Sequence, residues 1–80
     1  MKQEIDCENC KNQWKKLIGK YKGEFVTIKQ GRTCKDFVCD GCGTPIPKNS
    51  MAYAIGVYTR IIRNIPNWEK QYLTNVTEEK

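Results

Sequence analysis

Four cysteines in this sequence form two C-x-x-C motifs, one at Cys7 and Cys10 and the other at Cys39 and Cys42. A motif of this spacing presents two sulfur atoms from a tight turn, whose backbone N–H groups can hydrogen-bond to thiolates. Two such motifs in one short chain predict a tetrahedral metal site with four thiolate ligands.

Zinc is the metal that this ligand set favours, because a closed four-thiolate site suits zinc and leaves no coordination position open to substrate. We therefore expect one structural ion that stabilises the chain. Iron in a rubredoxin-like site uses the same ligands, but the knuckles of such sites usually carry glycine or proline around both pairs. Here Lys11 follows Cys10 directly, so iron is the less favoured alternative.

The fifth cysteine, Cys34, permits a second interpretation. Together with Cys39 and Cys42 it copies the C-x4-C-x2-C spacing of a plant-type iron–sulfur cluster. That motif needs a fourth cysteine downstream, and none follows Cys42. We expect Cys34 to pack as a small hydrophobic residue, as free cysteine often does. A role as an alternative ligand or as a reactive thiol stays open.

The composition is that of one small globular domain. The chain has 80 residues, of which 39% are hydrophobic and 29% are charged. Chains of this length commonly need a metal or disulfides to be stable. We expect a cytoplasmic protein without a membrane segment, because the first residues form no apolar run and thiols stay reduced in that compartment. The sequence has no histidine and no phosphate-binding glycine loop, so we expect no enzymatic activity.

Positive charge is concentrated in one part of the chain. The net charge is +5, and residues 11–35 hold eight Lys and Arg residues against one acidic residue, Glu24. A face built from this region would attract anions such as nucleic acid, although such stretches are often only solvated surface. The residues expected to contact phosphates are Lys15, Lys16, Lys20, Lys22, Lys29 and Arg32.

One segment shows the hydrophobic periodicity of a helix. The apolar residues Trp14, Leu17, Ile18 and Tyr21 recur at i, i+3, i+4 and i+7, which is the spacing of one helix face. This pattern predicts a helix over about residues 9–19.

Other segments favour strands and a second short helix. Residues 24–29 are rich in β-branched and aromatic side chains, and we expect residues 30–32 to form a turn that leads to a partner strand over 33–38. Residues 51–58 alternate large with small side chains and predict another strand. A proline and an asparagine just before Trp68 indicate the start of a short helix near the end of the chain.

These elements predict a small α+β domain stapled by metal, with a zinc-ribbon-like antiparallel β-sheet of about three strands and one or two short helices. We expect residues 1–73 to form this single zinc-binding domain. Residues 74–80 are expected to be a polar C-terminal tail.

The segment from Phe37 to Ser50, followed by Tyr53, resembles the knuckle-and-strand half of zinc-ribbon and treble-clef proteins. Such segments often read C-x-x-C-G-x-x-I, then a basic turn and a strand with an aromatic residue; here Asn49 stands where the turn usually has glycine. The segment from Trp68 to Leu73 is similar to the ending of short bacterial or phage zinc-ribbon-like proteins.

The resemblance implies a zinc-binding fold and no particular activity. A treble clef places its second ligand pair on the closing helix, but that helix has no cysteine here. The resemblance therefore implies a ribbon or a rearranged clef in which Cys7 and Cys10 complete the site.

The sequence thus predicts a small intracellular structural-zinc domain that acts as a non-catalytic binding module, with nucleic acid as one partner class. The alternative is a protein-interaction adaptor that presents the strand over 51–58 or the terminal helix to a partner. A redox-sensing thiol protein is the third, less favoured hypothesis.

Overall fold

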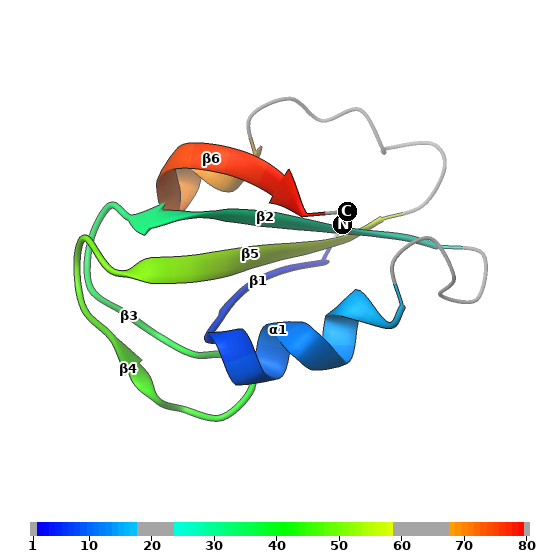
Figure 1. Cartoon of the computed structure of the whole chain (residues 1–80), viewed down its shortest axis with the longest axis horizontal. Helices are drawn as coiled ribbons and strands as arrows, with labels where there is room; N and C mark the ends of the chain where they lie inside the picture. The colour runs from blue at the N-terminus through cyan, green and yellow to red at the C-terminus, as the bar shows by residue number, and fades with distance from the viewer. Residues whose placement is uncertain (1, 18–23, 59–67, 80) are drawn as a thin grey trace.

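The structure is a computed structural model that describes residues 2–17, 24–58 and 68–79. A four-stranded antiparallel sheet forms its centre, with one α-helix on one face and a short two-stranded hairpin at one end (Figure 1). The elements, in chain order, are β1 (Lys2–Asp6), α1 (Glu8–Lys15), β2 (Phe25–Thr33), β3 (Phe37–Val38), β4 (Pro45–Ile46), β5 (Met51–Tyr58), the 3-10 helix η2 (Trp68–Gln71) and β6 (Leu73–Glu79).

The strand predicted over residues 51–58 is confirmed as β5, and it is an interior strand of the sheet. The strand order is β1-β5-β2-β6, so β5 pairs with β1 on one edge and with β2 on the other. Its alternation of large and small residues explains this position: the large residues pack against α1, whereas the small ones let other segments approach closely. Residues 52–57 are all buried.

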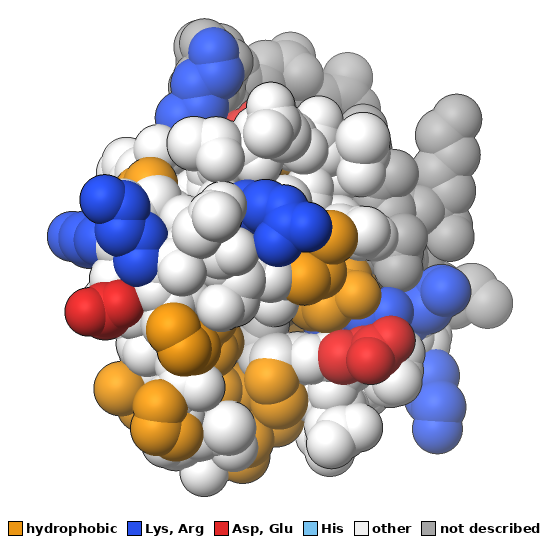
Figure 2. Space-filling view, turned by 60° about the vertical axis from the view of Figure 1, so that its left-hand side comes forward, with side chains coloured by type: hydrophobic (Ala, Val, Ile, Leu, Met, Phe, Trp, Pro, Cys, Tyr) orange, Lys and Arg blue, Asp and Glu red, His pale blue; other side chains and the backbone are white. Residues whose placement is uncertain are grey.

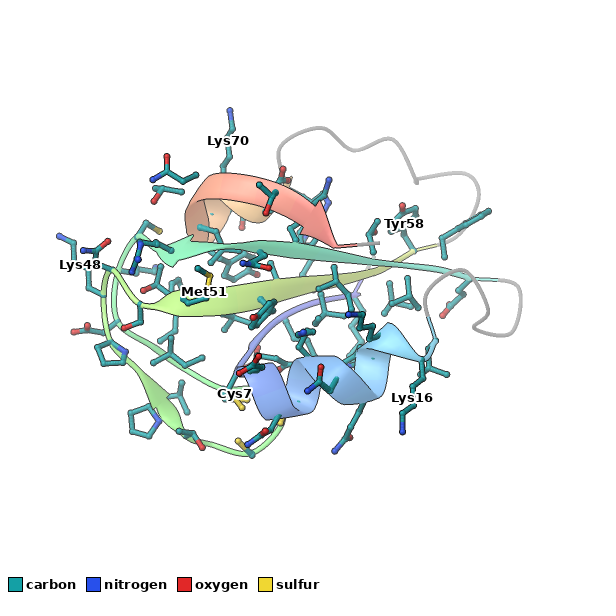
Figure 3. All side chains as sticks on the ribbon, in the orientation of Figure 1. Cys7, Lys16, Lys48, Met51, Tyr58 and Lys70 are labelled. Carbon is teal, nitrogen blue, oxygen red and sulfur yellow. The ribbon has the colours of Figure 1, made fainter. Side chains whose placement is uncertain are left out.

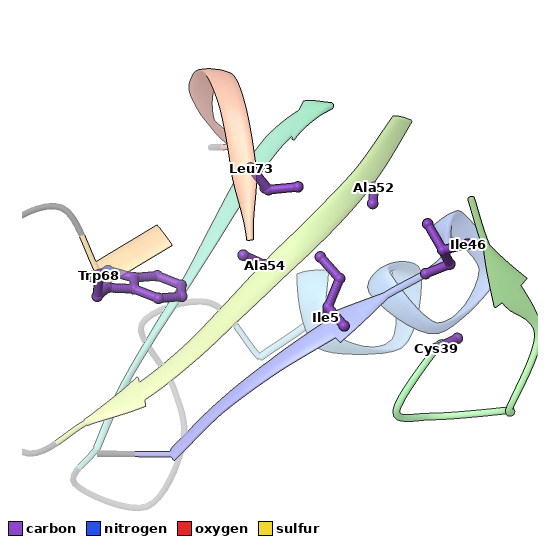
Figure 4. Close-up of a cluster of buried hydrophobic side chains, with 7 residues drawn as sticks. All are labelled: Ile5, Cys39, Ile46, Ala52, Ala54, Trp68 and Leu73. Atoms are coloured by element: carbon purple, nitrogen blue, oxygen red, sulfur yellow. The ribbon is translucent and has the colours of Figure 1, made fainter. Parts of the chain in front are cut away.

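The two faces of the sheet carry separate hydrophobic clusters. On the face that α1 covers, Tyr53, Ile55 and Val57 of β5 pack with two β2 residues, and Trp14 and Leu17 contact this group. On the opposite face, the alanines of β5 leave room for larger residues from other segments (Figure 4). That second cluster consists of Ile5, Cys39, Ile46, Ala52, Ala54, Trp68 and Leu73.

The helix predicted over residues 9–19 is present as α1, which ends at Lys15. Two residues of the predicted apolar stripe, Trp14 and Leu17, are half-buried against the sheet as expected. The other two, Ile18 and Tyr21, lie outside the described residues.

The predicted hairpin with a turn at residues 30–32 is wrong. These residues continue β2, and β3 is a two-residue strand that pairs with β4. A Cβ atom at Gly31 would lie 2.6 Å from the backbone oxygen of Thr74, so this glycine permits the close approach of β6 at an irregularity in the register. The glycine therefore marks an irregularity in the pairing of β2 with β6 instead of a turn.

The segment expected to be a polar tail over residues 74–80 contributes most of β6, which pairs with β2. The short helix expected near Trp68 is η2, and Trp68 is buried. Leu73, at the start of β6, is 1% exposed, so this edge strand is anchored by burial despite its polar composition.

The predicted fold class, a small α+β domain with an antiparallel sheet, is confirmed. The sheet has four strands where about three were expected: β1 and β6 were not anticipated, and the partner strand expected over residues 33–38 is not one of the four. Within the described part of the chain, no helix is long and apolar enough to span a membrane.

Candidate metal centre

The first C-x-x-C motif lies at the N-terminus of α1. Cys7 occupies the N-cap position in extended conformation, and its carbonyl oxygen accepts a 2.9 Å hydrogen bond from the backbone N–H of Lys11. Cys10 therefore lies in the first turn of the helix. The motif therefore presents both of its sulfurs at the N-terminal end of α1.

The second motif forms the tip of the β3–β4 hairpin. The Cys39 N–H donates to the carbonyl of Thr44, and the Gly43 N–H donates back to the carbonyl of Cys39, each at 2.8 Å. Gly43 has a φ of 79°, a left-handed conformation that a residue with a side chain rarely adopts. The turn directs the sulfurs of this motif toward the start of α1, where the sulfur atoms lie close together beside Cys7 (Figure 3).

Together the two motifs bring four sulfur atoms within 4.8 Å of one another, from Cys7, Cys10, Cys39 and Cys42. In a tetrahedral site with Zn–S bonds of about 2.3 Å, the sulfurs lie about 3.8 Å apart. The Sγ atoms of Cys7 and Cys42 are 3.7 Å apart. The geometry and the donor set therefore fit a tetrahedrally coordinated ion.

Gly41 permits this approach. A Cβ atom there would lie 2.7 Å from the Cys10 sulfur and 3.0 Å from the Cys10 Cβ. Any larger residue at position 41 would push the hairpin and the helix apart. The close approach of the two motifs therefore requires glycine at this position.

Backbone hydrogen bonds also join the two motifs. The carboxylate of Asp40 accepts a 2.8 Å bond from the Ile5 N–H, and the Asp40 N–H donates to the Ile5 carbonyl at 2.9 Å. The Cys7 N–H points at the sulfur of Cys39, 3.3 Å away. These contacts hold β1 and the hairpin tip in register at the site, and nothing in the sequence pattern singled out Asp40 for this role.

Cys10, Cys39 and Cys42 differ in their tendency to ionise. Burial and hydrogen bonds with the neighbouring cysteine sulfurs raise the pKa of Cys10. Burial opposes ionisation of Cys39 as well, but backbone N–H groups, including those of Cys7 and Gly41, lower its pKa. Hydrogen bonds from Thr44, whose Oγ1 is 3.0 Å from the sulfur, lower the pKa of Cys42 to about 6. Neighbouring thiolates repel one another, and a bound divalent cation would offset this repulsion.

One buried carboxyl group lies beside the cluster. Asp6 is 0% exposed, and its Oδ1 is 3.8 Å from the Cys39 sulfur. Burial, followed by the neighbouring Glu4 carboxyl, raises the pKa of Asp6 to about 8. Sequence reasoning missed this residue, because its position immediately before a knuckle does not reveal that it faces the buried side of β1.

The structure keeps Cys34 apart from the other four cysteines, all five of which are described. Its side chain is half-buried, and its sulfur is 3.4 Å from the carbonyl oxygen of Gln71. The four-sulfur group does not include it. The arrangement therefore does not support the plant-type cluster suggested by the spacing of Cys34, Cys39 and Cys42.

The four predicted phosphate contacts that the structure describes do not gather on one face. Lys15 and Lys16 are exposed at the end of α1, whereas Lys29 is half-buried on β2 beside Ala54, on the sheet face opposite α1. Arg32 is exposed and donates a 3.1 Å hydrogen bond to the carbonyl of Asn49. The remaining two, Lys20 and Lys22, lie outside the described residues.

The cluster is the feature of the described chain with the clearest chemistry: it can hold one metal ion between two chain segments that are distant in sequence. Comparisons with protein-family models, with curated proteins and with solved structures find no match to this chain.

Proposed function

We propose that this protein is a small intracellular domain stapled by one structural zinc ion, and that it acts as a non-catalytic binding module in the cytoplasm. The observation that carries the proposal is the convergence of four cysteine sulfurs within 4.8 Å, two from the start of α1 and two from the β3–β4 hairpin. An ion there would link the start of α1 to the tip of the β3–β4 hairpin, two segments that are distant in sequence.

The choice of zinc rests on the ligand chemistry. Four thiolates complete a tetrahedral shell, so a zinc ion there would have no open position for water or substrate. One ligand pair lies on a helix N-terminus and the other on a knuckle hairpin. This supports a rearranged treble clef, in which the helix precedes the hairpin along the chain.

Elemental analysis and native mass spectrometry of protein purified without oxygen test the metal centre. We expect one zinc per chain, retained in the Cys34→Ser variant and lost in Cys39→Ser. Cys34→Ser is the matched control because it removes a half-buried thiol that lies outside the cluster. Iron in place of zinc, or equal metal loss in both variants, would contradict the proposal.

We propose nucleic acid as the partner, and the support is the excess of positive charge over residues 11–35 together with the exposure of Lys15 and Lys16. Binding to a single-stranded oligonucleotide should weaken as salt rises. Replacing both lysines with Gln should reduce the log–log salt slope by about 1.4 if each contacts one phosphate of the single strand. The matched control replaces Lys48 and Lys70, which are also exposed, and removes the same charge elsewhere. Equal effects of the two double variants would contradict a localised interface.

A protein partner is the second candidate, and one observation favours it. Val38 and Met51 are large hydrophobic residues that are 55% and 47% exposed. Figure 2 shows hydrophobic side chains gathered on the end of the molecule that carries the β3–β4 hairpin. The strand β5 itself cannot accept an added strand, because both of its edges are paired. A photo-crosslinking residue at Val38 should capture a protein that the same residue at exposed Asn12 does not; capture of nucleic acid would contradict this candidate.

A further inference from the structure

The four cysteines of the cluster differ in their exposure to solvent. Cys39 is 2% exposed, Cys7 and Cys10 are half-buried, and Cys42 is exposed at the hairpin tip. Cys42 is therefore the cysteine of the cluster most accessible to a small oxidant that diffuses to the site from solvent. Susceptibility of cysteine to oxidation depends on this access together with thiolate character, which a metal-ligating sulfur has.

A second sulfur lies within reach of the first. The Sγ atom of Cys7 is 3.7 Å from that of Cys42, and the two residues come from different motifs. A disulfide needs a sulfur separation of about 2.05 Å, so the two sulfurs must move toward each other for the bond to form. The hydrogen bonds between Ile5 and Asp40, each two residues before one of these cysteines, hold the two backbones close to each other beside this pair.

We propose that the centre is an oxidation-sensitive site, at which peroxide converts Cys42 and Cys7 into a disulfide and thereby releases the bound metal. This inference rests on the proposed metal centre. The Cys42 thiolate attacks a peroxide oxygen, the O–O bond breaks, and the sulfur becomes a sulfenic acid as the first water leaves. The Cys7 thiolate then attacks that sulfur and forms the S–S bond, and hydroxide leaves and takes a proton. Two thiolates supply two electrons, and hydrogen peroxide with two protons becomes two water molecules.

The disulfide replaces the link that the metal provided. Two of the four ligands are consumed, so the remaining two cannot hold a four-coordinate ion. The new bond still joins the start of α1 to the hairpin tip, and the bonds between Ile5 and Asp40 stay in place. The oxidised chain therefore loses its metal and keeps its fold.

Cys34 provides the contrast within the same chain. It is half-buried, its sulfur contacts the Gln71 carbonyl, and it lies outside the cluster. It has no neighbouring cysteine with which to form an intramolecular disulfide in the described structure. Replacing it with serine removes a free thiol and leaves the proposed pathway intact.

The test adds hydrogen peroxide in limited amounts to metal-loaded Cys34→Ser protein and follows zinc with a chromogenic chelator. Free thiols are then alkylated and the protein is digested with trypsin. Cleavage after lysine places Cys7 and Cys10 in peptide 3–11, and Cys39 and Cys42 in peptide 36–48. A disulfide between the motifs joins these two peptides, whereas disulfides within the motifs leave them separate and each two hydrogens lighter.

We expect zinc release in proportion to the joined peptide, with the link mapped by fragmentation to Cys7 and Cys42. Circular dichroism of the oxidised protein should keep the signal of the folded state. Separate peptides with internal disulfides, or release that coincides with unfolding, would overturn the inference while leaving the metal centre intact. If the purified protein holds no metal before peroxide is added, the proposed function itself fails, and the two failures are thus distinguishable.

Discussion

Two glycines of the second knuckle, Gly41 and Gly43, are required for different physical reasons, and substitutions can separate these reasons. At Gly41 the limit is space, because a Cβ atom would lie 2.7 Å from the Cys10 sulfur. At Gly43 there is open space within 4 Å of a Cβ atom, and the limit is the φ of 79°. Asparagine is larger than alanine but tolerates the left-handed conformation better.

The magnitudes follow from these geometries. Ordinary contact begins at 3.4 Å, so alanine at position 41 must displace the Cys10 sulfur by about 0.7 Å, which exceeds the tolerance of about 0.2 Å in metal–ligand distances. Overpacking of this kind costs about 1–3 kcal/mol, which corresponds to zinc affinity about 5-fold to about 140-fold weaker. For Gly43→Ala the left-handed conformation costs about 1–2 kcal/mol.

Zinc affinity, measured by competition with a chromogenic chelator, should therefore rank the variants in opposite orders at the two positions. Gly43→Asn should bind more tightly than Gly43→Ala, because the larger residue accepts the conformation. Gly41→Asn should bind no better than Gly41→Ala, because added atoms only increase the overlap with Cys10. Rescue by asparagine at position 41, or its absence at position 43, would refute the reasoning.

Three further predictions concern the sheet, the turn before β5 and the metal ligands. Gly31→Ala should lower the free energy of unfolding by about 1–3 kcal/mol, because the alanine Cβ would meet the Thr74 carbonyl. Denaturant titration of the metal-loaded protein measures this change. Unchanged stability would contradict the close approach of β6. Thr33→Val should cost about 1–3 kcal/mol in the same assay, since this buried hydroxyl bonds to two backbone groups of that turn; a neutral effect would refute this. Thr44→Val should shift zinc loss to higher pH in an acid titration. Thr44 lowers the pKa of Cys42, so without it protons compete with zinc for the Cys42 sulfur at higher pH. An unchanged midpoint would count against this contact.

Local sequence spacing predicted the four-cysteine cluster and much of the secondary structure. The C-x-x-C spacing fixes two sulfurs per turn, so it predicted the four cysteines that the structure brings together. The alternation in residues 51–58 and the apolar spacing around Trp14 are also local, and they predicted β5 and α1. Asn49, which stands where the resembled turn usually has glycine, has a φ of 65°, a left-handed conformation that asparagine tolerates.

Only the tertiary structure decided how distant segments meet. Gly31 looked like a turn residue because the close approach of β6, more than 40 positions along the chain, is not visible locally. The polar residues of β6 gave no hydrophobic pattern, since this edge strand is anchored by backbone pairing with β2 and by the buried residue Leu73. The position of the hairpin against β1 determines three features of the site. These are the hydrogen bonds between Asp40 and Ile5, the burial of Asp6 and the exposure of Cys42. Spacing along the chain sets which atoms can act as ligands, whereas packing between segments sets which of those atoms solvent can reach.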